Sequence, residues 1–490
     1  MGNKFYLRRH MNVRDLAPKS VWNHFADLNA VPRPSKKEAR VIKFMQDFGS
    51  QLKLETYTDA IGNVIIKKPA TAGMEDRQTV ILQSHVDMVH QKNADTDFDF
   101  DTQGIEMYVD GDWVRANGTT LGADNGMGVA AIMAVLSSTD IAHPAIEALF
   151  TVDEETGMTG AMELEQGILK GTILLNLDTE DDDEFSIGCA GGIDTNTTYN
   201  YTPTELASGA KTYALTVNGL NGGHSGVQIN EELGNANKIM NRLMYNCQDY
   251  NLQIVSINGG SLRNAIPRES FSTVSATGDY VAEVQKRAAE IQAEFAIQDP
   301  NLAIEIKEVA SVNAAMSLSD THKVTTALYA VHNGVFRYSR AIEGLVETSS
   351  SLARVIVKDG AFITQSLQRS SVESGKYDVA FTVAAPFHLM GCQVEHKGDY
   401  PGWAPNSTSA ILDVLVAKYK ELFNNEEPKV MAIHAGLECG LLGERYPGLD
   451  MISFGPTIKG AHSPDERCSI ASTAKFWKFL LEILANVPMR

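Results

Sequence analysis

Three apolar runs in the first part of the chain constrain its fold most strongly, because each is continuous enough to be buried on both faces. They read TVILQSH at 79–85, IEALFTVDEE at 146–155 and GTILLNLDTE at 171–180. Near-continuous apolar strands are typical of a parallel sheet covered by helices on both sides. A helix-like stretch, GMGVAAIMAVLSS at 126–138, lies between the first two runs. We therefore expect an α/β layer with a mostly parallel sheet.

The pattern changes after about residue 190, where strands begin to alternate between apolar and polar residues. Examples are KTYALTVNGL, LQIVSI, LAIEIKEV and LARVIVKD, with helices expected at 233–247 and 281–295. Such alternation predicts an α+β module whose sheet is covered on one side. After YPGWAPNSTS the continuous apolar pattern returns, with a helix at 407–423, a strand MISFGP, a loop and a final helix.

This order predicts one domain interrupted by another. A chain of 490 residues exceeds the size at which a single core stops growing. We expect residues 1–190 and 401–490 to form a discontinuous α/β domain, and residues 191–400 to form an inserted α+β domain.

The composition of the chain argues against nucleic-acid and membrane partners. A net charge of −19, from 61 acidic and 42 basic residues, disfavours binding to phosphate backbones or anionic lipid. We expect no nucleic-acid partner and no membrane partner, since no stretch is apolar for the length that crosses a bilayer. The five cysteines are scattered and form no CxxC motif, which fits a reducing cytoplasm rather than a disulfide framework. The first ten residues do not resemble a structured element, so Met11 is an alternative start.

Polar side chains follow each of the three apolar runs. His85 closes the first run, Glu154 and Glu155 close the second, and Asp178 closes the third. In open α/β sheets, ligands bind beyond the carboxyl ends of the strands, so side chains far apart in sequence converge there. Two further candidates are Asp124 in LGADNGMGVA, just before a glycine-rich helical turn, and His462 in KGAHSPDE.

Two imidazoles and several carboxylates without cysteine form a ligand set for zinc, manganese or cobalt. Two ions about 3.5–4 Å apart, bridged by one carboxylate, use all these ligands and leave a position for substrate. Each residue alone has a simpler reading: a hydrogen-bonded histidine, a solvated acidic loop after Asp178, or a helix N-terminus at Glu154 and Glu155. The joint placement at several strand ends favours the metal site.

Two neighbours of these ligands have expected roles of their own. Asp87 lies two positions after His85 and is expected to orient its imidazole by accepting from the other ring nitrogen. If Glu154 and Glu155 are extended, they point opposite ways, so that one binds metal and the other acts as a base. No HExxH, P-loop or GxSxG motif is present as an alternative.

The motifs SHVDMV, TTLGADNGMG, DEETGMTGA, NLDTED and AHSPDE, in that order, resemble those of the aminoacyl-histidine dipeptidase family of di-zinc metallopeptidases. The resemblance extends to NGLNGGHSGVQI, GGSLRNAIPRE, YPGWAP and HAGLECGL. It implies that His85, Asp124 and Asp178 hold one zinc. It also implies that Asp124, Glu155 and His462 hold the other, with a cis peptide bond after Asp124.

The resemblance assigns further roles. Asp87 would orient a ligand and Glu154 would be the general base and acid. The inserted domain would act as a lid, in which His224 stabilises the oxyanion, Asn264 assists substrate binding and Arg369 clamps the terminal carboxylate. Rival clamps are Arg263 and Arg268, because the segment QSLQRSS fits the family less closely than the metal motifs do. Glu438 is expected near the substrate amine.

The function expected from these residues is hydrolysis of unmodified dipeptides, Xaa-His peptides included, with two Zn²⁺ ions for which Mn²⁺ or Co²⁺ can substitute. An N-acyl-amino-acid deacylase on the same metal site is the alternative enzyme. A catalytically silent metal- or peptide-binding protein is the alternative from another class. The resemblance also implies a homodimer.

Overall fold

The computed structural model describes residues 12–490, which form two compact units. The first unit holds the described residues through Gly188, together with Pro405–Ala432 and Glu438–Arg490. The second unit holds Cys189–Ala404 and the short segment Ile433–Leu437. That segment lies in the part of the sequence expected to belong to the first domain. The alternative start at Met11 lies outside the described residues.

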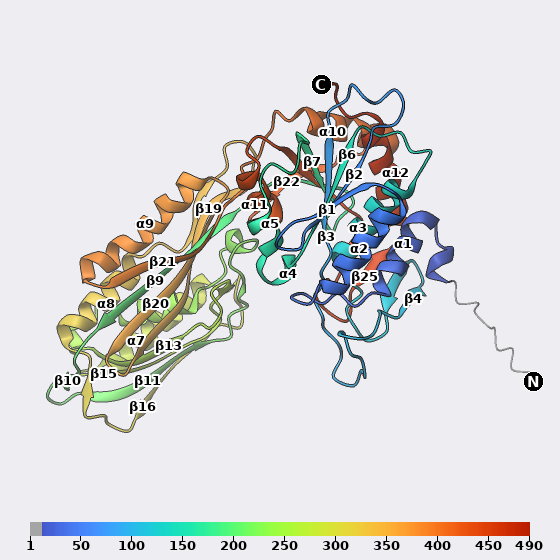
Figure 1. Ribbon diagram of the computed structural model, residues 1–490. Helices are drawn as coiled ribbons and strands as arrows, with labels where there is room; N and C mark the ends of the chain where they lie inside the picture. Colours follow the sequence, from blue (N-terminus) through green and yellow to red (C-terminus); the bar gives the residue numbers. More distant parts are fainter. Residues whose placement is uncertain (1–11) are drawn as a thin grey trace, which may run out of the picture. The chain divides into compact units, whose positions relative to one another are not determined.

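An eight-stranded sheet forms the centre of the first unit (Figure 1). Its strand order is β1 (Glu55–Thr58), β2 (Val64–Lys68), β6 (Ile146–Thr151), β3 (Val80–His85), β7 (Ile173–Asn176), β23 (Asp450–Ser453), β8 (Glu184–Cys189) and β22 (Lys429–Ile433). Parallel pairing joins β6, β3, β7 and β23, whereas β1, β2 and β8 pair antiparallel. The sheet is therefore mixed, with its parallel strands at the centre.

The central strands are buried along their whole length, as their apolar sequences require. Every residue of β3, β6 and β7 is buried. The helices of this unit are α1 (Lys19–Asn29), α2 (Ala39–Gln51), α3 (Ala123–Ser137), α4 (Glu154–Gly157), α5 (Thr159–Glu163), α10 (Ala410–Leu422), α11 (Glu438–Arg445) and α12 (Ile470–Ala485), with a 3₁₀ turn at Val13–Asp15. Helix α3 packs against β3 and α1 and is apolar on all sides, which is the pattern of a helix buried between layers.

A second, four-stranded sheet was not expected from the sequence. It has the order β24 (Ile458–Lys459), β25 (Arg467–Ser469), β5 (Trp113–Ala116) and β4 (Met107–Asp110). The segment after β23, expected to be a plain loop, is thus a hairpin that pairs with β5. His462 lies in this hairpin rather than at the end of a strand of the large sheet.

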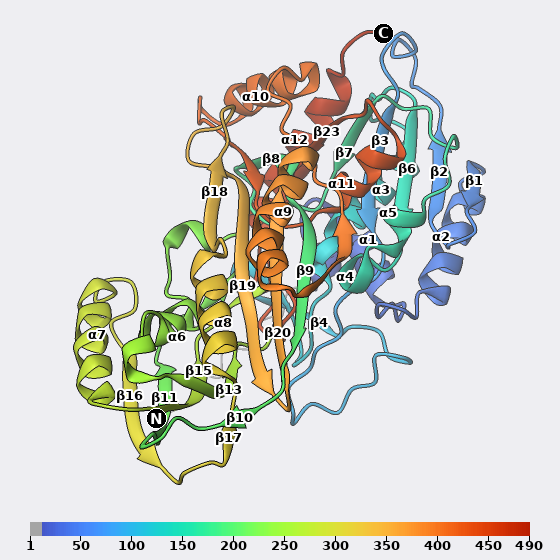
Figure 2. The same cartoon turned by 90° about the vertical axis from the view of Figure 1, so that its left-hand side faces the viewer.

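The second unit is built on an antiparallel sheet (Figure 2). Its order is β16 (Ala303–Val309), β11 (Lys211–Asn218), β15 (Ser270–Ala276), β13 (Gln253–Gly259), β19 (Val346–Lys358), β20 (Ala361–Ser370), β9 (Gly191–Asn200) and β21 (Gln393–Tyr400), and β18 (Gly334–Tyr338) pairs with β19. Two short pairs accompany it: β10 (Thr204–Glu205) with β17 (Ala314–Ala315), and β12 (Gly223–His224) with β14 (Ala265–Ile266). Buried and partly exposed residues alternate along these strands as the sequence predicted, for example in β11.

Four helices pack on this sheet and enclose the core of the second unit. They are α6 (Ala236–Met244), α7 (Tyr280–Glu294), α8 (Leu318–Ala330) and α9 (Glu373–Met390), and 3₁₀ turns lie at Ile229–Glu231 and Gln248–Tyr250. Figure 2 shows α9 in front of β19 and β20. Apolar residues of all four helices join those of β11, β13, β15, β19 and β20 in one cluster. No helix within residues 12–490 combines the length and the apolar character needed to cross a membrane.

Candidate metal centre and substrate-binding residues

One group of ligand atoms gathers around His85 in the first unit. Its Nε2 lies 3.3 Å from Oδ1 of Asp124 and 3.6 Å from Oδ1 of Asp178. Oε2 of Glu154 is somewhat farther from the same nitrogen, at 3.9 Å. The strand β3 places His85 at its last residue, and Asp178 follows the end of the neighbouring strand β7 by two residues. Adjacent parallel strands therefore bring these side chains to one edge of the sheet.

A second group gathers on the other side of Asp124. Nε2 of His462 lies 3.1 Å from Oδ2 of Asp124 and 3.0 Å from Oε2 of Glu155. The two carboxylate oxygens of Asp124 thus face two different imidazoles. The structure brings together all five residues that the sequence singled out as ligands, in two groups of three that share Asp124.

The backbone around Asp124, whose two oxygens face His85 and His462, departs from helical geometry. Gly122 caps α3 with a left-handed conformation (φ 69°), which glycine adopts without a steric penalty. Asp124 and Asn125 have non-helical angles although they lie in the first turn of α3. The peptide bond between them is cis, as the resemblance implied.

Asp87 is an acceptor for several groups around His85. Its Oδ1 lies 3.2 Å from Nδ1 of His85, and Ser35 donates a hydrogen bond to Oδ2 at 2.8 Å. The backbone N–H groups of Glu154 and Glu155 also donate to Asp87, at 3.1 and 3.3 Å. Asp87 therefore joins the strand that ends in His85 to the turn that carries both glutamates.

Glu154 and Glu155 are not extended, so the alternative of a helix N-terminus describes their backbone. They form the first turn of α4, which follows Asp153 in a left-handed conformation (φ 57°). The side chains diverge because successive residues of a helical turn point about 100° apart. Glu155 faces His462, whereas Glu154 lies nearer to His85.

The electrostatics of the cluster fit a site built for cations. Burial raises the pKa of Glu154 to about 8, and the neighbouring carboxylates add to this effect. Burial, reinforced by Asp124, also raises the pKa of Asp178. Hydrogen bonds to Asp124 and Glu155 raise the pKa of His462 to about 11. Without other positive charge, such a cluster of buried acids must take up protons.

Two unpaired atoms support the same interpretation. Oε1 of Glu155 and Oδ1 of Asp178 are buried and accept no hydrogen bond from residues 12–490. An unsatisfied buried carboxylate oxygen is costly, and a divalent cation satisfies it. Oxygen and imidazole ligands without thiolate fit zinc, manganese or cobalt. The residues present therefore fit a pair of divalent cations.

Glu438 lies in the first unit beside this cluster. Gln83 of β3 and Thr151 of β6 donate hydrogen bonds to its Oε2, at 2.7 and 2.8 Å, while Oε1 is unpaired among the described residues. Burial raises the pKa of Glu438 to about 7, and the nearby charge of His85 opposes the shift. Gln83 had no expected role, because a glutamine within an apolar strand carries no recognisable motif.

Two substrate-binding candidates of the second unit share a short β-bridge. His224 in β12 pairs with Ala265 in β14, and the N–H of Ser225 donates to the carbonyl of Asn264 at 2.9 Å. Nδ1 of His224 accepts hydrogen bonds from the backbone N–H groups of Gly226 and Val227, at 3.1 and 3.2 Å. Burial and the charge of Arg369 lower the pKa of His224. The neutral ring therefore carries its proton on Nε2, where it can donate.

Arg369 is the most buried of the three candidate clamps. It is 4% exposed, donates to the hydroxyl of Tyr400 at 2.9 Å, and forms no ion pair within the described residues. Arg263, by contrast, is exposed and pairs with Asp194 at 3.1 Å. Arg268 is exposed as well and donates to the carbonyl of Leu220. A buried guanidinium without a carboxylate partner is suited to bind one from a ligand.

His434 belongs to the surroundings of Arg369 but was not singled out in the sequence. It is buried, and its Nε2 lies 2.7 Å from the hydroxyl of Ser349. Burial, with the charges of Arg369 and His224, lowers the pKa of His434 to about 3. The only sequence cue was its place in HAGLECG, where attention fell on Glu438.

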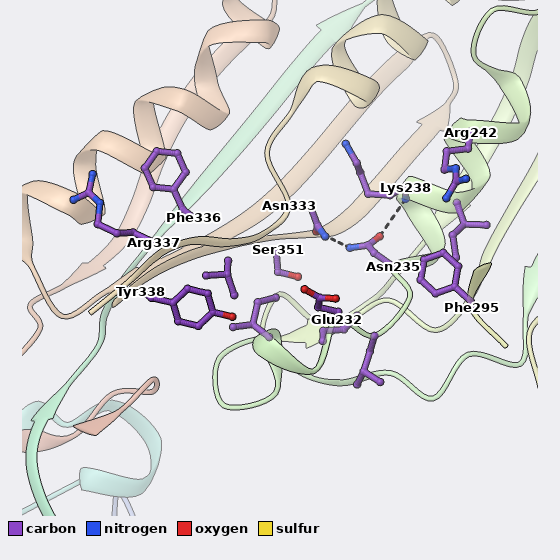
Figure 3. A pocket seen from close by; sticks show the side chains of 16 residues that line it. Glu232, Asn235, Lys238, Arg242, Phe295, Asn333, Phe336, Arg337, Tyr338 and Ser351 are labelled. Carbon is purple, nitrogen blue, oxygen red and sulfur yellow. Dashed lines mark hydrogen bonds between the residues drawn. The ribbon is translucent and has the colours of Figure 1, made fainter. Parts of the chain in front are cut away.

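A cavity of about 590 Å³ in the second unit contains none of these residues (Figure 3). Its basic side chains have partners: Arg242 pairs with Glu294 at 2.7 Å and Lys238 donates to three backbone carbonyls. Figure 3 shows that Asn235 donates a hydrogen bond to Asn333, and both residues line the cavity. Arg337 pairs with Glu347, so among the described residues that line the cavity no cation is free for an anionic ligand.

Comparison with known proteins identifies close relatives. The model of Peptidase family M20/M25/M40 matches residues 81–486. The cytosol non-specific dipeptidase of Escherichia coli (strain K12) is 41% identical over 98% of this chain and 99% of its own length. The crystal structure of aminoacylhistidine dipeptidase from Vibrio alginolyticus matches with a TM-score of 0.94 and 42% identity, covering 98% of this chain and 99% of that one. Aminopeptidase PepT from Bacillus cereus, 16% identical with a TM-score of 0.57 over 96% and 99% of the two chains, shares the fold.

Proposed function

Because the chain belongs to Peptidase family M20/M25/M40, we infer that it is a metal-dependent dipeptidase. The observation that carries this function is the similarity to a dipeptidase at 41% identity across nearly the full length of both chains. The arrangement of two imidazoles and three carboxylates in the first unit supplies the chemistry that such an enzyme needs.

We propose that two divalent cations bind in this arrangement. One would be held by His85, Asp124 and Asp178, and the other by Asp124, Glu155 and His462. The distances around Asp124, 3.1 Å and 3.3 Å to the two imidazoles, support its role as the bridge. When bound, the cations would supply Lewis-acid activation of water and of the scissile carbonyl group. Zinc is the proposed metal, with manganese or cobalt as substitutes.

Glu154 is the proposed general base and acid. Its carboxylate lies beside the proposed ligands but outside the closest contacts, a position that suits a group that accepts and returns a proton. Glu154 would accept a proton from the attacking water on its carboxylate and give it to the leaving amine. Asp87 would hold the imidazole of His85 in the orientation that leaves Nε2 free to bind.

The second unit is proposed to act as a lid that recognises the substrate. His224 would donate from Nε2 to the oxyanion, Arg369 would bind the terminal carboxylate, and Asn264 would assist in binding. Glu438 would lie near the substrate amine. Recognition of both charged ends explains a preference for dipeptides, since a longer chain has no free carboxylate at the second residue. We also propose that the protein forms a homodimer and acts in the cytoplasm.

The substrates proposed are unmodified dipeptides, with Xaa-His peptides among them. The V. alginolyticus relative is named for aminoacylhistidine peptides and the E. coli relative for dipeptides without specificity. A deacylase of N-acyl amino acids on the same metal site is the alternative enzyme.

A substrate panel tests the function. Purified protein is depleted of metal, reloaded with Zn²⁺ or Mn²⁺, and assayed on dipeptides, tripeptides and acetyl amino acids, with metal content measured on the same sample. The reloaded protein should hydrolyse dipeptides, and the depleted protein should not. Faster hydrolysis of acetyl amino acids than of any dipeptide would favour the deacylase instead.

A further inference from the structure

Glu466 is the last residue before β25 in the hairpin that carries His462, and its carboxylate is buried against the turn that carries Asp124. The side chain is 2% exposed. Four successive backbone N–H groups donate to it: Leu121 (2.7 Å) and Gly122 (2.9 Å) to Oε2, and Ala123 (2.7 Å) and Asp124 (3.2 Å) to Oε1. Both oxygens are therefore fully used as acceptors.

This arrangement differs from an ordinary helix cap. The first N–H groups of a helix lack partners within the helix, and a nearby side chain usually accepts one or two of them. Here a single carboxylate from a distant part of the sequence accepts four. Its own N–H donates to the carbonyl of Ser463, next to His462. One residue thus fastens the segment of one proposed ligand to the segment of another.

Arg33 holds the opposite side of the same turn. It is 1% exposed, and its Nη2 donates to the carbonyl oxygen of Gly122 at 2.5 Å. Its Nη1 donates to the carbonyl oxygens of Val86 and Asp87, at 3.2 and 2.9 Å. The peptide group between residues 122 and 123 therefore lies between a buried guanidinium and a buried carboxylate, because its C=O accepts from Arg33 and its N–H donates to Glu466.

We propose that Glu466 and Arg33 are positioning residues that clamp this peptide group, so that Asp124 presents one oxygen toward His85 and the other toward His462. The inference rests on the proposed metal-dependent function. Clamping from both sides fixes the turn before any cation binds. A preformed site loses less binding free energy to the ordering of its ligands than a site that becomes ordered only on binding. Without the clamp, the two oxygens of Asp124 would no longer be held toward both imidazoles.

The experiment measures the affinity of the metal-free protein for Zn²⁺ by competition with a coloured chelator. Glu466→Gln keeps the shape but replaces one acceptor oxygen by an NH₂ group facing two N–H donors. We expect its affinity at one or both sites to fall by roughly 10- to 100-fold, the usual effect of removing a group that orients a ligand. Activity of Glu466→Gln should recover as the Zn²⁺ concentration is raised. Arg33→Lys, whose single ammonium group cannot reach the carbonyl oxygens of Gly122, Val86 and Asp87 at once, should lose Zn²⁺ affinity too.

Glu147→Gln is the matched control. Glu147 is also buried in the first unit, and its Oε2 accepts from the N–H groups of Lys170 and Gly171, at 2.7 and 2.9 Å, but that turn carries no proposed ligand. Glu147→Gln should lower the unfolding midpoint and leave Zn²⁺ affinity unchanged.

The outcomes separate the inference from the function on which it rests. If the wild-type protein binds no Zn²⁺, the proposed function and the inference both fail. If it binds two Zn²⁺ per chain and the Glu466 and Arg33 variants bind as tightly, only the inference is overturned. An equal loss of affinity in the control also overturns it, because general destabilisation then explains the effect. Should Glu466→Gln not fold, the affinity of Arg33→Lys decides.

Discussion

At the scale of single residues, the proposed chemistry depends on the protonation states of a few side chains and on the atoms that they contact. Glu154 and Glu155 are adjacent, yet only Glu155 contacts His462 closely. This difference in placement assigns proton transfer to the first and metal binding to the second.

Replacing Glu154 by Gln should lower kcat by about 100- to 10,000-fold, the range typical of losing a positioned acid–base group. Both cations should stay bound, because Glu154 is not one of the five proposed ligands. Steady-state kinetics and metal analysis on the same sample check this. Glu163→Gln, the same change at an exposed position in α5, should have no effect. Substantial turnover in a metal-loaded Glu154→Gln protein would remove the residue from the mechanism.

Arg369→Met should chiefly raise KM for dipeptides, by about 10- to 100-fold, because hydrogen bonds to charged groups contribute roughly 1.5–3 kcal/mol. Discrimination against dipeptide amides should weaken at the same time. Arg263→Met, at an exposed arginine paired with Asp194, is the control and should leave both quantities unchanged. Unaltered discrimination in Arg369→Met would show that another group binds the carboxylate.

His434 should make the second unit sensitive to acid. Its pKa of about 3 in the folded protein lies below the ordinary 6.5, so the unfolded chain binds the proton more tightly. Stability contributed by neutral His434 is therefore complete above about pH 6.5 and is lost as the pH falls toward 3.

Between pH 7.5 and 4.5, wild type should lose more free energy of unfolding than His434→Gln. The difference should be on the order of 2–3 kcal/mol, since each pH unit between the two pKa values is worth about 1.36 kcal/mol. Hydrogen exchange of the amides of β19 measures it. His388→Gln, at an exposed histidine of α9, is the control and should leave the pH profile of stability as it is in wild type. Parallel pH profiles for wild type and His434→Gln would refute the account of His434.

The sequence could not reveal the residues that act on backbone atoms. Glu466 and Arg33 bind peptide groups of residues far away in the chain, and no side-chain pattern marks such contacts. His85 and Asp178, by contrast, end apolar runs, so their place at one sheet edge follows from the strands themselves.

At the scale of elements, long apolar runs were informative and short segments were not. The strands β3, β6 and β7 and the helix α3 lie where the sequence predicted them. The turn α4 and the hairpin β24–β25 were not predicted, because a helix of four residues or a strand of two or three shows no periodicity of its own. Their conformations depend on contacts with Asp87 and with β5.

Contact between α3 and the strands makes Gly128 a sensitive position. A Cβ atom there would lie 2.4 Å from Oγ of Ser84 and 2.6 Å from the carbonyl oxygen of Leu177, next to Asp178. Gly128→Ala should therefore destabilise the protein by about 1–3 kcal/mol despite the better helix propensity of alanine. Chemical denaturation measures the change.

Gly443→Ala in α11 is the control for that substitution. The nearest atom to its added Cβ is the flexible end of Met451, at 2.8 Å, so the neighbour can move aside. Its stability should change by less than about 1 kcal/mol. A Gly128→Ala protein as stable as Gly443→Ala would mean that α3 does not pack as closely as described.

At the scale of the whole molecule, segments that are far apart in the sequence form one compact unit around the ligand cluster. Residues from before Gly188 and after Glu438 both contribute, as Asp124 and His462 illustrate. The length of the chain, 490 residues, predicted more than one core. It could not indicate that residues 433–437 group with the second unit, because that depends on backbone pairing of Ala190 with this segment.

The central claim is that five side chains hold two divalent cations about Asp124. Anomalous X-ray scattering from crystals of the Zn²⁺-loaded protein tests it most directly. We predict two peaks per chain, one among His85, Asp124 and Asp178 and the other among Asp124, Glu155 and His462. A single peak, or peaks away from Asp124, would contradict the account.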